Sequence, residues 1–304
     1  MAEFAAAGEP AAGPTLVELL SPDELGSLIT LKGLLAQYEA GEIVDDDDDP
    51  APAAAPAPAA GSPTRPYRFS DAAVVRFLRG RKHDESKAFR ALLRHLKWRA
   101  ANNVAAITAD MVKVEANQRK IVVHGKDREE RPAIYIFAYR HKTSDRDINI
   151  MQQFIIYTLE QTMRLTKPTE EKLVIVFDLS DFTLACMDYE VVKMLVNILQ
   201  FNYPEVLHTA LVVNAPMIFS ACWMVIRPWL DPVTAGKVQF VRKDEVSKYI
   251  DKKQMPPDFE TPDKFDDDED DEEGEEGGEG EGGGGGEGEG KEGAAKAAAP
   301  GSER

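Results

Sequence analysis

Strand-length apolar runs alternate with helical segments beyond residue 120, and this alternation restricts the fold more than any other feature of the sequence. The clearest run, residues 173–177, has five apolar residues in succession, as expected of a strand buried on both faces. Strands that alternate with helices of about 10–20 residues predict βαβ units, a mainly parallel sheet and an α/β fold. The expected strands are residues 120–124, 132–139, 173–177, 210–213 and 238–241, and the expected helices are residues 147–165, 189–201, 217–229 and 244–251.

Further helices are expected before the sheet. Leucines spaced by three and four residues from Thr15 to Ala40 predict a short helical hairpin, and Ser21 is placed to begin its second helix. Ser70 and Asp84 are candidate caps for two more helices, each with one apolar face. We expect the leucine face of the hairpin to pack against the core.

The net charge of −17 is unevenly distributed along the chain. Residues 62–262 carry 31 basic and 24 acidic side chains, whereas residues 1–61 carry 1 and 12, and residues 263–304 carry 4 and 17. The central segment is therefore basic, and both flanks are acidic. A basic surface suits anionic partners such as lipid headgroups or nucleic acid, and the acidic flanks would compete for it.

The stretch Thr209–Ile226 has 18 residues without a charge, which is long enough for a membrane helix. Residues 214–216 (Asn-Ala-Pro) interrupt it, so we interpret it as a buried strand followed by an exposed apolar helix. The start of the chain has no basic segment and no continuous apolar run, so we expect no signal peptide. Cys186 and Cys222 have neither disulfide-framework nor zinc-site spacing, and we expect a reducing compartment.

Catalytic motifs are missing from the sequence. Glycines 280, 282 and 285 match a dinucleotide-binding pattern, but no strand precedes them and no helix follows. The five histidines never lie three or four residues apart, and no nucleophile elbow or zinc-protease motif is present. Asp178 ends a buried strand, where α/β folds often place function, but it would equally cap the following turn. We expect no catalytic site, no metal and no cofactor.

One helix is unusual because no face of it suits water. Residues 217–226 (Met-Ile-Phe-Ser-Ala-Cys-Trp-Met-Val-Ile) carry no charge. Such a helix is either fully buried or closes over an apolar cavity. A polar loop, residues 231–237, follows soon after it and brings a cation to the entrance of the next strand.

Several short motifs occur in the order found in the CRAL-TRIO family. Residues 76–82 (Arg-Phe-Leu-Arg-Gly-Arg-Lys), with the amphipathic helix that ends at Trp98 and Arg99, resemble the N-terminal helical part of the family. Four further segments resemble successive motifs of its lipid-binding domain: residues 176–179 (Val-Phe-Asp-Leu), 202–205 (Asn-Tyr-Pro-Glu), 213–216 (Val-Asn-Ala-Pro) and 228–234 (Pro-Trp-Leu-Asp-Pro-Val-Thr). The resemblance covers about residues 70–250, and residues 42–61 depart from it as a low-complexity insertion.

The resemblance implies a fold in which a sheet and a mobile helical gate enclose one lipophilic molecule in an apolar cavity. The gate would include Ile218, Phe219, Trp223 and Ile226, and the cavity would be lined by Leu173, Ile175 and Phe177, which share one face of their strand. The domains would be an N-terminal helical extension (1–41), a disordered acidic and Pro-Ala linker (42–66), an N-terminal helical subdomain (67–105), the lipid-binding domain (106–255) and a disordered acidic, glycine-rich tail (256–304).

In the phosphatidylinositol-transfer branch of the family, a Glu after Tyr-Pro and a Lys after Asp-Pro-Val-Thr bind the inositol phosphate. Glu205 and Lys237 occupy these positions, Thr234 would donate to a phosphate oxygen, and Arg81 and Lys82 match basic residues near the same headgroup. The alternative interpretation is a surface salt bridge near a loop. The branch also binds phosphatidylcholine through a Ser and a Thr where this chain has Leu173 and Ile175, so the resemblance does not support choline binding there.

The resemblance implies a cytoplasmic protein, peripherally associated with membranes, that binds phosphatidylinositol and exchanges it between membranes or presents it to lipid-modifying enzymes. A carrier of another hydrophobe, such as a tocopherol, a retinoid or a sterol precursor, remains an alternative, although it leaves Glu205 and Lys237 without a role. A lipid-regulated protein-interaction module is the other alternative. We expect a bound phospholipid as ligand, transient contact with a membrane surface, no nucleic-acid partner and no enzyme activity, and the sequence indicates no protein partner.

Overall fold

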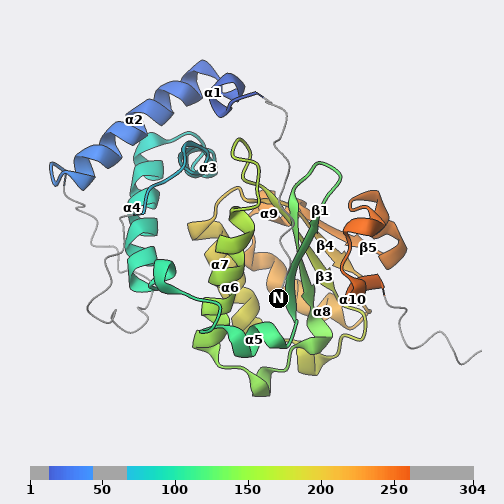
Figure 1. Ribbon diagram of the computed structural model, residues 1–304. Helices are drawn as coiled ribbons and strands as arrows, with labels where there is room; N and C mark the ends of the chain where they lie inside the picture. Colours follow the sequence, from blue (N-terminus) through green and yellow to red (C-terminus); the bar gives the residue numbers. More distant parts are fainter. Residues whose placement is uncertain (1–13, 44–66, 261–304) are drawn as a thin grey trace, which may run out of the picture. The chain divides into compact units, whose positions relative to one another are not determined.

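A five-stranded sheet forms the centre of the structure, a computed structural model that describes residues 14–43 and 67–260 (Figure 1). The strands lie side by side in sequence order: β1 (Ile121–Lys126), β2 (Pro132–Phe137), β3 (Leu173–Asp178), β4 (Leu207–Val213) and β5 (Val238–Val241). β1 pairs with β2 in antiparallel orientation, and every other neighbouring pair is parallel. The predicted α/β class and mainly parallel sheet are confirmed.

Helices lie in the connections between the parallel strands, in the segment before β1 and after β5. The helices of the described residues are α1 (Leu16–Leu19), α2 (Pro22–Glu39), α3 (Asp71–Gly80), α4 (Glu85–Ala101), α5 (Lys113–Asn117), α6 (Ile148–Met163), α7 (Tyr189–Asn202), α8 (Phe219–Ile226), α9 (Pro232–Gly236) and α10 (Pro257–Glu260). None of them, within the described residues, has both the length and the apolar character needed to cross a membrane. The uncharged stretch Thr209–Ile226 is divided between β4 and α8, as its Asn-Ala-Pro interruption predicts.

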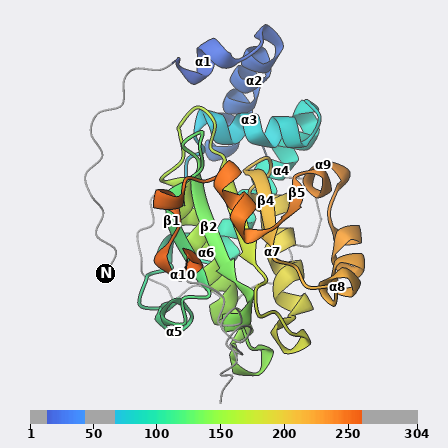
Figure 2. The ribbon, with the colours of Figure 1, turned by 90° about the vertical axis from the view of Figure 1, so that its right-hand side faces the viewer.

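The two faces of the sheet are covered by different parts of the chain (Figures 1 and 2). On β3, Leu173 and Ile175 face a cluster built with α6 and α7, whereas Val174 and Val176 face the segment that follows β5. Successive residues of a strand point to opposite faces, so the continuous apolar run of β3 supplies both layers. Burial on both faces explains why none of these four side chains is more than 2% exposed.

A separate cluster joins α2 to α3 and α4. Leu28, Leu31 and Leu35 of α2 pack against apolar side chains of both helices, including Phe77 and Leu92. The helices begin where capping side chains accept backbone hydrogen bonds: Ser21 from Glu24, Ser70 from Ala73 and Asp84 from Lys87. The leucine face of α2 therefore packs against α3 and α4, as predicted. The first helix of the predicted hairpin is the short α1, and it buries no side chain.

Two predictions about the end of the fold are wrong. The predicted tail begins at residue 256, but residues 257–260 form α10, and Phe259 is buried with its ring centroid 5.4 Å from that of Tyr135. A single aromatic side chain anchors this turn before the acidic run starts. The helix expected over residues 244–251 is a tighter 3₁₀ segment, Lys243–Lys248. Residues 44–66 of the linker predicted over 42–66, and the tail beyond residue 260, lie outside the described residues.

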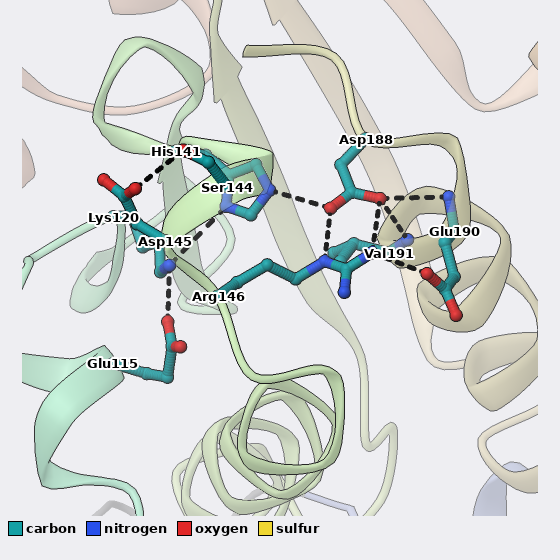
Figure 3. A network of polar contacts seen from close by, with 9 residues as sticks. All are labelled: Glu115, Lys120, His141, Ser144, Asp145, Arg146, Asp188, Glu190 and Val191. Atoms are coloured by element: carbon teal, nitrogen blue, oxygen red, sulfur yellow. Dashed lines mark hydrogen bonds and ion pairs between the residues drawn. The ribbon is translucent and has the colours of Figure 1, made fainter. Parts of the chain in front are cut away.

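A buried ionic network fixes the amino end of α7 (Figure 3). Asp188 accepts backbone hydrogen bonds from Glu190 and Val191, and its carboxylate also receives Arg146 Nε at 2.6 Å. His141 Nε2 lies 3.1 Å from the same carboxylate, and its Nδ1 lies 3.5 Å from Lys120 Nζ, which in turn pairs with Glu115. An ammonium group can only donate, so His141 Nδ1 accepts and Nε2 carries the proton donated to Asp188.

The network lowers the pKa of Asp188. Burial alone would raise it, but the hydrogen bonds from Arg146, Val191 and His141 outweigh burial and lower the pKa from 3.8 to about 2. The ionised carboxylate therefore stabilises the fold at neutral pH. Because the pKa is lower in the folded protein, this stabilisation is complete above about pH 4 and is lost as the pH falls towards 2.

We predict that Asp188→Asn lowers the free energy of unfolding by about 2 kcal/mol at neutral pH, the value that corresponds to this pKa shift. The difference between wild type and variant should shrink as the pH falls from about 4 to 2. Denaturant titrations across this pH range measure it. The control is Glu190→Gln, whose side chain is 64% exposed and whose loss should cost less than about 1 kcal/mol. A constant difference at all pH values would contradict the assignment.

Candidate functional site

Three charged side chains meet at the amino ends of the parallel strands. Lys172 immediately precedes β3, Lys237 immediately precedes β5, and Glu205 lies two positions before β4. Parallel strands that pair in register place these positions side by side at one edge of the sheet. Glu205 Oε2 lies 3.2 Å from Lys237 Nζ and 3.8 Å from Lys172 Nζ. The structure thus brings together the two central residues of the predicted headgroup site and adds a second lysine.

The group is neither fully exposed nor sealed. The side chains of Lys172, Glu205 and Lys237 are 24%, 28% and 19% exposed, so a ligand can reach each of them. Burial lowers the pKa of Lys172, and repulsion by Lys237 lowers it further, while Glu205 opposes both effects. Glu170 also attracts Lys172, and Asp231 attracts Lys237, so Glu205 is not alone in compensating the two ammonium groups.

Glu205 is held in a backbone conformation that residues other than glycine rarely adopt. Its φ of +58° lies in the left-handed region, and strain of this kind persists only where surrounding contacts enforce it. The preceding residues are fixed from two directions. Arg76 Nη1 donates to the carbonyl of Pro204 at 2.9 Å, and the Tyr203 hydroxyl donates to Glu160 at 2.6 Å.

Arg76 is a positioning residue that the sequence did not reveal. It is 6% exposed, and besides Pro204 it holds Glu171 through Nε at 2.9 Å and Nη2 at 2.8 Å. Glu171 lies just before Lys172, so one guanidinium supports the chain before β3 and the chain before β4. Gly80, at the end of the same helix, packs so closely that an added Cβ would come within 3.0 Å of Pro204. The sequence motif contained both residues, but only their three-dimensional contacts show their role.

The other three predicted headgroup residues, Arg81, Lys82 and Thr234, do not contact the Glu205–Lys237 pair directly. Arg81 follows Gly80 and is partly buried, and burial together with repulsion by Arg94 lowers its pKa. Lys82 is exposed, with a φ of +55°. Thr234 lies in α9, where its hydroxyl donates to Asp231 at 2.6 Å and its amide is capped by the same carboxylate. Among the predicted five, only Glu205 and Lys237 contact each other directly.

The apolar helix is one-sided in the structure. Phe219 and Ile226 of α8 are buried against Leu179, Phe182 and Val212, and Trp223 packs partly against the same cluster. Ile218 instead lies on the surface, so the predicted gate set divides between inward and outward positions. The large apolar side chains of its outer surface, here called the α8 face, are Met217, Ile218, Met224 and Val225, all at least 46% exposed.

Asn214 anchors the chain where it leaves β4 for α8. Its amide donates to Val241 of β5, its side-chain nitrogen donates to Ser180, and its side-chain oxygen accepts from the amide of Lys243. Asp178, considered above as a functional residue, accepts from the amide of Ser180 at 3.0 Å and caps the turn after β3. These contacts tie the carboxyl ends of β3, β4 and β5 together.

Comparison with known proteins identifies the family. The profile described as CRAL/TRIO domain matches residues 116–260. The SEC14 cytosolic factor of Eremothecium gossypii is 30% identical over 218 residues, which cover 63% of this chain and 69% of that protein. The chain belongs to the CRAL/TRIO domain family.

Other relatives of this CRAL/TRIO chain are longer. A CRAL-TRIO domain-containing protein of Schizosaccharomyces pombe is 30% identical over 190 residues, 59% of this chain and 43% of that protein. The phosphatidylinositol transfer protein CSR1 of Eremothecium gossypii is 30% identical over 201 residues, 62% of this chain and 46% of that protein. The chain thus spans less than half the length of these two relatives. The crystal structure of Sfh5 shares the fold, with a TM-score of 0.52 and 17% identity over 59% of this chain and 67% of that one.

The residues expected to line the CRAL/TRIO cavity lie between two clusters. Leu173 and Ile175 belong to the layer with α6 and α7, and Phe177 packs against both this layer and the α8 cluster. Two pockets, of about 200 and 370 Å³, open elsewhere, beside Tyr67, and Glu160 and Arg164 of the α6 region line both. Neither of these two pockets is lined by the three predicted residues, and a lipid cavity beneath α8 stays a prediction.

We predict that Arg76→Met lowers the free energy of unfolding by about 3 kcal/mol, because it leaves Glu171 largely buried without its counter-charge. The matched control is Arg242→Met, at an exposed ion pair. Arg242 is 76% exposed and its partner Asp244 is 69% exposed, so its loss should cost less than about 1 kcal/mol. Chemical denaturation of both variants measures the difference. Equal losses would show that Arg76 has no special role in joining α3 to the site.

Proposed function

We propose that this chain binds one phospholipid, phosphatidylinositol in particular, and exchanges it between membranes or presents it to lipid-modifying enzymes. The observation that carries the proposal is the 3.2 Å pair of Glu205 and Lys237, in the positions where the phosphatidylinositol-transfer branch recognises its headgroup. A relative named as a phosphatidylinositol transfer protein supports the same ligand. Cytoplasmic location and peripheral membrane association are part of the proposal.

The pair has complementary tasks in this proposal. Lys237 neutralises the phosphate, and Glu205 accepts hydrogen bonds from inositol hydroxyls or orients the lysine. Arg81 and Lys82 add positive charge from the end of α3. Thr234 would have to exchange its bond to Asp231 for one to phosphate. No covalent step is needed, so we propose a carrier and not an enzyme.

The acyl chains would occupy the space between the sheet and α8. Leu173, Ile175 and Phe177 would form the floor, and Phe219, Trp223 and Ile226 would face the chains from the helix. Transfer of a methylene group from water to such a site is favourable by about 0.8 kcal/mol. The α8 face has no charge and is exposed, as expected of a surface that contacts a membrane while the lipid passes.

We predict that Lys237→Ala weakens phosphatidylinositol binding by about one to two orders of magnitude, since it removes a charge-assisted bond of about 1.5–3 kcal/mol. Glu205→Ala should act in the same direction. The measurement is transfer of labelled phosphatidylinositol between vesicles. The matched control is Lys193→Ala, an exposed lysine near the opposite end of α7 from the site, which should transfer like wild type.

Undiminished transfer by Lys237→Ala would contradict the headgroup assignment and favour a carrier of an uncharged hydrophobe. Such a ligand should bind equally to wild type and to both variants, because neither residue touches its apolar body. Mass spectrometry of the lipid extracted from the purified chain identifies the ligand directly.

We also predict that α8 moves when lipid exchanges. Its exposed surface carries no charge, and Pro216 and Pro228 limit how far the helix extends at either end. Hydrogen exchange over residues 217–229 should rise when vesicles are added, while exchange in the buried strand β3 stays constant. Full protection of the helix during measurable lipid exchange would assign the gate to another element.

A further inference from the structure

The α8 segment, defined here as residues 216–230, is contacted by two side chains of α7. The Tyr189 ring packs edge-on against the Trp229 ring, with the centroids 6.0 Å apart and an angle of 83° between the planes. Gln200 Nε2 donates to the carbonyl of Trp229 at 3.1 Å. Tyr189 also forms a side-chain hydrogen bond with Cys222 of α8, which raises the pKa of the Tyr189 hydroxyl. Trp229 is thus held through its ring and through its backbone by one helix.

Tyr189 and Gln200 lie on the same face of α7. From residue 189 to residue 200 the helix makes about three turns, so the two side chains leave it in nearly the same direction. Val192 shares this face and packs with the α8 cluster, whereas Leu195 and Ile198 pack with the cluster that includes α6 and the sheet. α7 therefore joins the α6 side of the fold to the α8 segment.

α7 is fixed at both of its ends. Asp188, the residue before Tyr189, is buried in the ionic network of Figure 3 and caps the first turn of the helix. At the other end, Asn202 is buried, and its Oδ1 lies 3.3 Å from Nδ1 of His95 in α4. Tyr189 and Gln200 therefore extend from a helix that is anchored to other parts of the fold.

The α8 segment has few polar contacts with the rest of the fold. Among residues 14–43 and 67–260, Tyr189 and Gln200 are the two side chains that form hydrogen bonds to it from outside. Its other contacts are apolar, with Phe219 and Ile226 buried in the α8 cluster. Apolar burial is not directional, whereas a hydrogen bond and an edge-on ring pair require a defined geometry. The contacts with α7 are therefore the ones that fix the position of the segment.

We propose, on the basis of the carrier function proposed above, that Tyr189 and Gln200 form a latch that holds the α8 segment closed and thereby sets the rate of lipid exchange. Both are positioning residues, and neither needs to touch the lipid. Outward movement of α8 separates the segment from α7 and breaks these contacts together. Tyr189 is 39% exposed, so water can replace its contacts while α7 stays folded.

The first test measures hydrogen exchange over residues 217–229 without vesicles, in wild type, Tyr189→Ala and Gln200→Met. Both substitutions lie outside the measured segment, so the intrinsic exchange rates of its amides do not change. Exchange should rise about three- to tenfold in each variant, as expected for the loss of an edge-on ring pair or of one neutral hydrogen bond. Tyr189→Phe keeps the ring pair with Trp229, and its effect should be smaller than that of Tyr189→Ala.

The second test measures transfer of labelled phosphatidylinositol between vesicles by the same variants. Tyr189→Ala and Gln200→Met should each transfer the lipid faster than wild type, by a factor similar to the rise in hydrogen exchange. The matched control is Phe201→Ala, at an aromatic residue of the same helix that is 58% exposed, and it should leave both measurements unchanged. Circular dichroism melting curves check that each variant is folded.

The two tests separate the latch from the proposed function. If wild type transfers the lipid but neither variant alters hydrogen exchange, the latch is overturned and the proposed function stands. Faster hydrogen exchange without faster transfer would likewise overturn the latch, because its contacts would then not control lipid exchange. A wild type that transfers no lipid would overturn the proposed function, and with it the role of the latch.

Discussion

Parallel hydrogen bonding between β3, β4 and β5 aligns the amino ends of three strands that are far apart in sequence. The same register that buries Val176 beside Leu211 also places Lys172, Glu205 and Lys237 at one edge. Strand pairing thus sets the positions of the two lysines, and Glu205 lies between them in the loop that leads into β4. A loss of register in β3 would disturb the core and the charges together.

The helical layer contributes to the site through one buried guanidinium. Arg76 reaches from α3 to the carbonyl of Pro204, and through Glu171 it also supports the chain before Lys172. The opposite side of the Tyr203-Pro204 loop is held by Glu160, which Arg99 of α4 clamps with two hydrogen bonds at 2.8 and 2.9 Å. The left-handed conformation of Glu205 is therefore maintained by side chains of three helices outside the sheet, α3, α4 and α6.

Local signals in the sequence predict most of the helices and strands. Contacts between residues that are distant in sequence cannot be predicted from such signals. Ser70 and Asp84 cap the helices α3 and α4, as their side chains predict. The run of five apolar residues at 173–177 is a buried strand, as its length and apolar character predict. The pairing of Glu205 with Lys237 was expected from family motifs. The partners of Arg76 and Lys172 were not, because each depends on the packing of segments that are distant in sequence. Phe259 was missed since one aromatic residue in a polar segment has no periodicity.

The helix α8 is also the crossover between two adjacent parallel strands, and this connectivity limits how it can move. Its first end is tied to the carboxyl end of β4 through Asn214, and the chain returns through Asp231 to the amino end of β5. While both strands stay in the sheet, the two attachment points stay at opposite ends of it. The helix can then rotate outward about an axis through its two attachment points, but it cannot slide along the sheet. Any such opening exposes the layer beneath along its whole side, and not through a hole at one end.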